Sequence, residues 1–374
     1  MSRRDFSRRD TSRRDAAFCA VFLSASFGFI ACLSRSYILS SEPAPPPPPP
    51  ATEVAGGGAL GFDIWQDNPE DFYALVGGEP RPGDPVTLIF LPASGGDAAR
   101  YAALKAVLLD TNGKKLGGAR FFDWTLDDEG HTVKASVFAA PSTYDGGVAL
   151  VRIEGTQGIL IEFGLKLGER SFASEEIPLN PVNTALRTVP DPKKTAESEL
   201  LWSIITGAGD VVYTAGPFTP PVAADTRRTS FFGARRVYRY SNGRSDTAVH
   251  AGIDYGVPVG TPVGACGAGR VALARSRIVT GNSVVIEHLP GVYSIYYHLD
   301  RITVEEGAFV NEGDAIGLSG MTGLATGPHL HWEMRAAAEN TDPDILCARA
   351  VLDFDAAKKL VNERGAKVYA ELSR

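Results

Sequence analysis

Three short strings in the last third of the chain combine strand-like sequence with metal-binding side chains. His250 and Asp254 lie in HAGID, His298 lies in YYHL, and His329 and His331 lie in GPHLHWE. Imidazole and carboxylate groups are ligands of borderline cations such as zinc, and a catalytic zinc site uses three protein ligands with one position left open. Any fold that uses these groups together must bring three separate segments to one place.

The spacing within each string predicts which side chains share a face. Residues at i, i+2 and i+4 of an extended segment lie on one face, so we expect His250 and Asp254 to point the same way, with only Gly252 between them. The HxH string at 329–331 places two imidazoles together and turns its central leucine to the opposite face. HxxxD and HxH therefore offer four coordinating groups where three are needed, which leaves one histidine for chemistry.

Either motif alone arises often by chance, whereas HxxxD, a middle histidine and HxH in this order form a specific pattern. His131, in DDEGHT, is expected to be a solvated loop residue, and His288 is expected to cap a strand. The chain has no HExxH and no GxSxG string. A helix-borne metal site with a glutamate base and a serine nucleophile elbow are therefore not indicated.

The stretch from about Arg228 to Pro343 resembles the lysostaphin-type (LytM-like) zinc metallopeptidases, which cut peptide cross-links in bacterial peptidoglycan. The matching strings are TSFFGARR at 229–236, HAGIDYGVPVGTPVGA at 250–265, GNSVVIEH at 281–288, YSIYYHL at 293–299, VNEGDAIGLSG at 310–320 and TGLATGPHLHWEMR at 322–335. Trp332 and Met321 are small departures from the family pattern.

This resemblance implies a role for each candidate residue. His250, Asp254 and His331 would hold Zn²⁺, while His298 and His329 would act on water and on the transition state. We assign His329 as the general base and His298 as the donor to the oxyanion or to the leaving amine, because both must lie within hydrogen-bond reach of the attacking water.

The implied function is that of a zinc metalloendopeptidase that binds the peptide stems of bacterial peptidoglycan and hydrolyses its peptide cross-links during cell-wall remodelling or division. Two alternatives stay open. The chain could be a catalytically silent LytM-like scaffold that binds and activates another cell-wall hydrolase, or a zinc peptidase that acts on a protein substrate. A silent scaffold usually has lost one or more ligands, and none is lost in this sequence.

The fold class indicated is mainly β. Residues 282–288 and 292–299 are rich in β-branched and aromatic residues and flank a short Leu-Pro-Gly connection, which predicts an antiparallel hairpin. The LytM-like domain should therefore be an antiparallel β-sheet whose groove accepts an extended peptide. Four aromatic residues are candidates for the groove walls or, alternatively, for the core: Tyr255, Tyr293, Tyr297 and Trp332.

The length of 374 residues favours two domains. Residues 61–177 are expected to form an immunoglobulin-like β-sandwich, which is either a spacer or wall-targeting module or a structural support. Its strands are expected at 86–91, 106–110, 133–137, 148–153 and 159–167. Residues 178–225 read as a proline-rich connector with a helix at 196–205, residues 226–347 as the peptidase domain, and residues 348–374 as a closing segment with a helix at 356–372.

The first 33 residues read as a basic leader with a signal or anchor segment. SRRD recurs three times in residues 2–15, directly before the apolar run 16–33, so the leader is expected to direct the rest of the chain across the cytoplasmic membrane. Cys32 is either a lipidation site or an ordinary apolar cysteine, and the arginine pairs resemble a twin-arginine export signal. Residues 34–60, rich in proline and glycine, form a linker. We expect a bacterial cell-envelope protein held at the membrane by this anchor or by a lipid.

The net charge of −7 and the isoelectric point near 5.5 argue against a nucleic-acid partner. Outside the leader, the chain has only Cys266 and Cys347. A disulfide between them fits an oxidising compartment but does not follow from their spacing. Neither belongs to a CxxC string, so we do not count them among the metal ligands.

Overall fold

The computed structural model describes residues 62–68, 72–77, 80–92, 101, 103–125, 132–353 and 355. The described chain is mainly antiparallel β, as the sequence indicates. The leader, the linker, His131 and the helix expected at 356–372 lie outside the described residues. Within them, no helix has the length and hydropathy that a membrane crossing requires.

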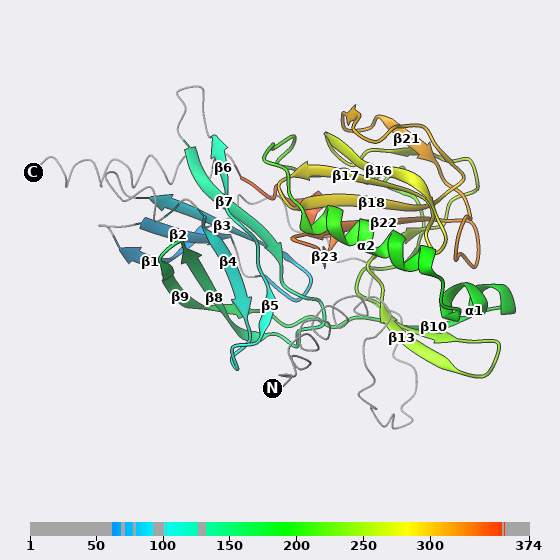
Figure 1. The fold of residues 1–374 in the computed structure, drawn as a ribbon, viewed down its shortest axis with the longest axis horizontal. Coiled ribbons are helices and arrows are strands. Elements are labelled where there is room, and N and C mark those ends of the chain that lie inside the picture. Colours follow the sequence, from blue (N-terminus) through cyan, green and yellow to red (C-terminus); the bar gives the residue numbers. More distant parts are fainter. Residues whose placement is uncertain are drawn as a thin grey trace, which may run out of the picture. The chain divides into compact units, whose positions relative to one another are not determined.

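Residues 62–167 form two antiparallel sheets (Figure 1). The first has the order β1-β2-β3-β7-β6, with β1 (Phe62–Asn68), β2 (Phe72–Gly77), β3 (Pro85–Pro92), β7 (Thr132–Ala139) and β6 (Phe122–Thr125). The second has the order β5-β4-β8-β9, with β5 (Lys115–Gly117), β4 (Lys105–Leu109), β8 (Gly147–Gly155) and β9 (Gly158–Leu167).

This strand order is that of an immunoglobulin-like sandwich. The path β2-β3-β7-β6 corresponds to strands A-B-E-D, and β5-β4-β8-β9 corresponds to C′-C-F-G. Alternate residues of both sheets fill the core, among them Leu88 and Phe138 from the first sheet and Val151 and Leu165 from the second. The five strands expected from the sequence are β3, β4, β7, β8 and β9.

The second part of the chain is built on one large sheet with the order β11-β14-β22-β18-β17-β16-β20. Its strands are β11 (Arg228–Ser230), β14 (Gly252–Tyr255), β22 (Leu330–Ala336), β18 (Val292–Leu299), β17 (Gly281–Leu289), β16 (Gly269–Arg277) and β20 (Phe309–Val310), and β23 (Glu339–Thr341) pairs with β22. β17 and β18 form the expected hairpin. A small sheet combines β15 (Pro262–Gly264), β21 (Ala315–Leu318) and β19 (Arg301–Ile302).

Both faces of the large sheet are covered. On one face lies α2 (Pro192–Thr206) (Figure 1). Its residues Leu201 and Ile205 pack against side chains of β16, β17 and β18. On the other face, alternate residues such as Val284 and Ile286 join a second apolar cluster. α2 begins four residues before the expected helix, because Asp191 caps its first turn and Pro192 fits the first helical position.

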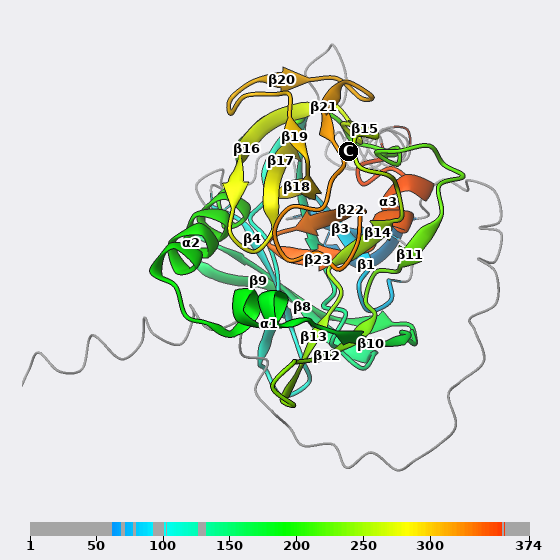
Figure 2. The same cartoon turned by 90° about the vertical axis from the view of Figure 1, so that its right-hand side faces the viewer.

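The connector also contains α1 (Pro181–Thr188), which the sequence analysis did not anticipate, and α3 (Pro343–Ala348) follows β23. A third sheet has the order β10-β12-β13 and combines β10 (Ser174–Pro178), β12 (Arg235–Arg239) and β13 (Ser245–Val249) (Figure 2). β10 pairs in parallel with β12, and this pairing sets Glu175 opposite Arg236. Through this pairing β10, which follows the sandwich strands in sequence, lies beside β12, which precedes the HAGID string.

Candidate metal centre

Three neighbouring strands bring part of the site together through their register. Asp254 of β14 pairs with His331 of β22, and His331 pairs with Tyr297 of β18. Directly opposed residues of antiparallel strands project to the same face. The carboxylate, the imidazole and the phenol ring therefore form one row across the sheet, and the Tyr297 ring stacks on His331 with centroids 5.4 Å apart.

His250 reaches this row in a way that differs from the expectation. An extended segment from His250 to Asp254 would separate their Cα atoms by about 13 Å. At that separation the two side chains could not bind one metal ion. His250 instead lies between β13 and β14, where the chain passes from the three-stranded sheet to the large sheet. Its backbone N–H donates to Ala234 O at 2.8 Å, and its carbonyl accepts from Gly233 N at 2.8 Å.

Gly252 lets two strands of the site approach closely. A Cβ at this position would lie 2.0 Å from Trp332 O, so β14 approaches β22 too closely for any side chain. The backbone contact with the neighbouring strand therefore requires a glycine.

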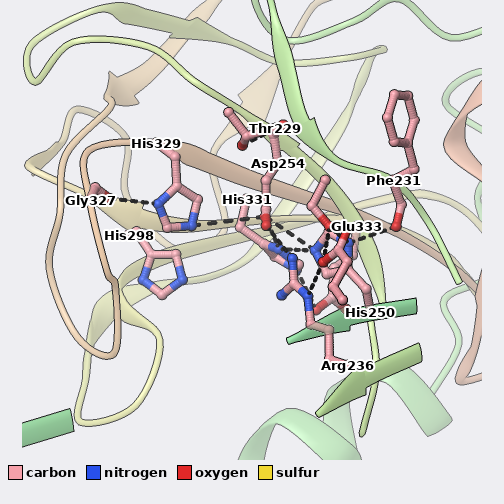
Figure 3. A network of polar contacts seen from close by, with 12 residues as sticks. Thr229, Phe231, Arg236, His250, Asp254, His298, Gly327, His329, His331 and Glu333 are labelled. Carbon is pink, nitrogen blue, oxygen red and sulfur yellow. Dashed lines mark hydrogen bonds and ion pairs between the residues drawn. The ribbon is translucent and has the colours of Figure 1, made fainter. Parts of the chain in front are cut away.

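Three potential ligand atoms converge as a result (Figure 3). Asp254 Oδ1 lies 3.2 Å from His250 Nε2 and 2.7 Å from His331 Nδ1, and the two imidazole nitrogens are 3.1 Å apart. All three residues are buried. A buried set of one carboxylate and two imidazoles with mutually close donor atoms could hold a metal ion.

Hydrogen bonds to the second ring nitrogens orient both imidazoles. His250 Nδ1 donates to Phe231 O at 2.8 Å, which directs Nε2 to the cluster. His331 Nε2 donates to Glu333 Oε1 at 3.0 Å, which directs Nδ1 there. Such partners fix the tautomer and the orientation of a metal-binding histidine.

The charges around His331 are strongly coupled. Burial opposes protonation of His331, but hydrogen bonds and charges of Asp254 and Glu333 outweigh it and raise the pKa of His331 to about 9. Burial also opposes ionisation of Glu333, and Arg335 with His331 outweighs that effect, lowering the pKa of Glu333 to about 2. Without a metal, the cluster therefore holds a proton that a bound cation would displace.

His298 enters the site through an irregularity in β18. Tyr297 and His298 are neighbours in sequence and would point to opposite faces of a regular strand, yet both rings lie near His331, with centroid distances of 5.4 Å and 6.2 Å. His298 has a φ of 61°. The β17–β18 register shifts between the pairs Asn282↔Leu299 and Val284↔Tyr296. This bulge turns the imidazole back to the site.

His298 and His329 face one another at the edge of the cluster, with ring centroids 4.8 Å apart. His298 Nδ1 donates to Thr322 O at 2.7 Å, and His329 Nδ1 donates to Gly327 O at 2.8 Å. His329 Nε2 lies 3.8 Å from Asp254 Oδ1. Burial, followed by the neighbouring His329 and His331, lowers the pKa of His298 to about 3.

The sequence analysis missed the residues that hold the ligands in place. Arg236 Nη2 donates to Asp254 Oδ2 at 2.5 Å, and Ser230 Oγ lies 3.1 Å from His250 Nδ1. Nothing in the spacing of TSFFGARR indicates these contacts. Glu333 could have been found, because it lies two residues after His331 and therefore shares its face of β22.

The remaining candidates belong to the core. Tyr255, Tyr293, Tyr297 and Trp332 are at most 4% exposed, which favours the core interpretation over groove walls. His288 lies within β17, fully buried, and contacts Ala268 O and Ser294 Oγ. Cys266 and Cys347 are free thiols, so the disulfide is absent from the described residues.

The geometry is that of a metal-dependent hydrolase built on an antiparallel sheet. Residues 248–343 match the family model described as Peptidase family M23. The match covers about a quarter of the chain and falls within the stretch in which the sequence resemblance was found.

Two curated relatives and one solved structure illustrate the similarity. The peptidoglycan DD-endopeptidase ShyA of Vibrio cholerae is 42% identical over 114 residues, which are 30% of this chain and 26% of the relative. The DD-carboxypeptidase/endopeptidase Mpg of Neisseria meningitidis is 38% identical over 135 residues, 36% of this chain and 30% of the relative. The catalytic domain of lysostaphin from Staphylococcus simulans is 27% identical with a TM-score of 0.29, over 33% of this chain and 94% of that domain. The chain thus spans under a third of the length of these two curated relatives.

Proposed function

We propose that this protein is a zinc metalloendopeptidase that hydrolyses peptide cross-links of bacterial peptidoglycan. One observation carries the proposal: three donor atoms from His250, Asp254 and His331 lie within 3.2 Å of one another, with His298 and His329 beside them. Of the relatives that share the sequence of this domain, ShyA is named a peptidoglycan DD-endopeptidase and Mpg a DD-carboxypeptidase/endopeptidase.

The donor set fits zinc. Bonds of about 2.0–2.1 Å at a tetrahedral centre separate neighbouring ligand atoms by ~3.3 Å, and the three separations here are 2.7, 3.1 and 3.2 Å. Two imidazoles and one carboxylate leave a fourth position for water or substrate. When bound, zinc would supply a Lewis acid that polarises the scissile carbonyl and acidifies water.

His329 and His298 would move the protons. In each ring, Nδ1 is engaged by a backbone carbonyl, so Nε2 is the atom that can exchange a proton at the site. His329 Nε2 lies 3.8 Å from the ligand atom Asp254 Oδ1, which supports His329 as the general base. His298 would serve as the donor to the oxyanion or to the leaving amine after its Nε2 has taken up a proton at the site, because Nδ1–H already donates to Thr322 O and the low pKa keeps the resting ring neutral.

The relatives named as peptidoglycan endopeptidases support peptidoglycan as the substrate class. This substrate in turn supports a location in the cell envelope. Peptide stems of peptidoglycan lie outside the cytoplasmic membrane, so the enzyme would act in the cell envelope. Export through residues 1–33 and retention by an anchor or a lipid at Cys32 remain predictions. The linker at 34–60 and the sandwich at 61–177 would precede the connector at 178–225, the peptidase domain at 226–347 and the closing segment at 348–374.

Digestion of purified cell-wall sacculi with the zinc-loaded full-length protein tests the proposal. We expect cross-linked muropeptide dimers to decrease and monomers to increase, as measured by mass spectrometry of the released fragments. His298→Ala is the matched control, because it changes a proton-transfer group and leaves the three ligands in place. A zinc-loaded protein that leaves the dimers intact, yet increases cleavage by a second wall hydrolase, would replace the proposal with the scaffold function.

A further inference from the structure

Glu175 of β10 contacts two separate supports of the metal ligands. Its carboxylate accepts from Arg236 Nε at 3.1 Å and from Ser230 Oγ at 2.7 and 2.8 Å. Arg236 in turn donates to Asp254, and Ser230 Oγ lies beside His250 Nδ1. One carboxylate therefore reaches two of the three candidate ligands, each through a single intermediate side chain.

We propose that Glu175 is a positioning residue of the metal centre, which holds Asp254 and His250 in a ligating geometry through Arg236 and Ser230. This inference rests on the proposed function, because it assumes that the three ligand residues bind zinc. It adds a role for β10, a strand that lies outside the matched region 248–343.

Arg236 is a long side chain, and a single contact to Asp254 Oδ2 would leave its guanidinium free to rotate. The contact at Nε fixes the far side of the guanidinium plane. The parallel register supports this arrangement, since it sets Glu175 directly opposite Arg236 across the β10–β12 pair. The side chains of Arg236 and Asp254 are 12% and 9% exposed, so water competes little for these contacts.

A guanidinium 2.5 Å from a metal-binding carboxylate draws charge from that carboxylate and repels a divalent cation. Glu175 offsets the positive charge of Arg236 from the side away from the cluster. Replacing Glu175 by an amide would remove this compensation and raise the positive potential at the ligands.

Glu176 provides a control on the same strand. It alternates to the other face of β10 and pairs with Arg239 on the surface, where its side chain is 62% exposed. Glu175→Gln and Glu176→Gln remove the same charge from adjacent residues. Only Glu175 contacts Arg236 and Ser230, the residues that hold the metal ligands.

The test measures zinc affinity of the full chain by competition with a chromophoric chelator. We expect Glu175→Gln to weaken zinc binding by about 10–100-fold, the range found when partners of metal ligands are replaced, and Glu176→Gln to bind as the wild type does. The absorption bands of the cobalt-substituted protein should shift in Glu175→Gln alone. A purely structural role would lower the melting temperature of the metal-free protein and leave the cobalt spectrum unchanged.

Ser230→Ala provides a second, smaller change if Glu175→Gln does not fold. It should weaken zinc binding several-fold, and in a folded Glu175→Gln protein it should add little, because both act on His250 by the same route. Equal zinc affinity and equal cobalt spectra in wild type, Glu175→Gln and Ser230→Ala would overturn the positioning role while leaving the peptidase proposal intact. A wild-type protein that binds no zinc would overturn both.

Discussion

At the scale of single residues, the histidines of this chain differ in what surrounds them rather than in their chemistry. His331 lies between two carboxylates, whereas His298 lies beside two imidazoles and has the opposite pKa shift. His288 is enclosed by core residues and a backbone carbonyl. We therefore expect substitutions at these three histidines to affect different properties, namely zinc binding, activity and the pH dependence of stability.

His331→Ala should abolish zinc binding at micromolar metal, because it removes one of three ligands and leaves the Glu333 carboxylate beside the cavity. The loss should exceed ~100-fold, the upper range for replacing partners of ligands. His298→Ala should keep zinc and lose activity by a factor of about 100 or more, as expected for a proton-transfer group. Metal analysis and sacculus digestion of both variants check this. Stoichiometric zinc in the His331→Ala protein would contradict the ligand assignment.

His288 should make stability depend on pH. Burial lowers its pKa from 6.5 to about 4, so below pH 6.5 the unfolded chain binds a proton that the folded chain does not. The free energy of unfolding should therefore fall as the pH decreases from 6.5 to 4, by at most ~3 kcal/mol. His288→Asn keeps a donor for Ala268 O and cannot titrate.

The difference in unfolding free energy between wild type and His288→Asn, measured with denaturant, isolates this contribution from the other histidines. It should be largest at pH 7 and shrink towards pH 4. A difference that stays constant across this range would show that His288 does not titrate on unfolding.

At the scale of elements, the site depends on how closely β14 and β22 approach. Gly252→Ala would place a Cβ 2.0 Å from Trp332 O, and backbone cannot rotate away as a side chain can. The two strands must separate, which also moves Asp254 from His331. We expect a loss of ~1–3 kcal/mol in stability together with weaker zinc binding.

Gly327→Ala is a suitable control, because a Cβ at that position meets no atom within 4 Å and the loop is next to the same site. Thermal melting and chelator competition should distinguish the two variants. Wild-type zinc affinity in the Gly252→Ala protein would mean that the strand spacing tolerates a methyl group.

At the scale of the whole molecule, the sandwich and the peptidase sheet belong to one compact unit. Arg170 Nη1 donates to Asp84 Oδ1 at 2.9 Å, next to the sandwich strands, and Arg170 Nη2 pairs with Asp342, the N-cap of α3. Outer-face residues of β7, such as Val137, share an apolar cluster with Met334 of β22. The sandwich thus supports the peptidase sheet directly.

Arg170→Ala should destabilise this unit by about 3–5 kcal/mol, because it leaves two buried carboxylates without their shared cation. Asp342→Asn in the same background should restore part of the loss. Arg239→Ala, which breaks the exposed pair with Glu176, should change the stability far less, because solvent screens this pair. Calorimetry of the three proteins checks this, and an Arg170→Ala protein as stable as Arg239→Ala would show that the two parts fold independently of this contact.

The sequence by itself determined which groups have metal-binding chemistry, five strands of the sandwich and the β17–β18 hairpin, since side-chain chemistry and alternation are local properties. The tertiary structure alone decided how these groups meet. His250 reaches Asp254 where the chain passes between two sheets, His298 turns inward at a bulge, and Glu175 reaches the site through a parallel strand pair. Periodicity specifies the face of an element that a side chain occupies, whereas distances between elements depend on strand pairing and packing across the whole chain.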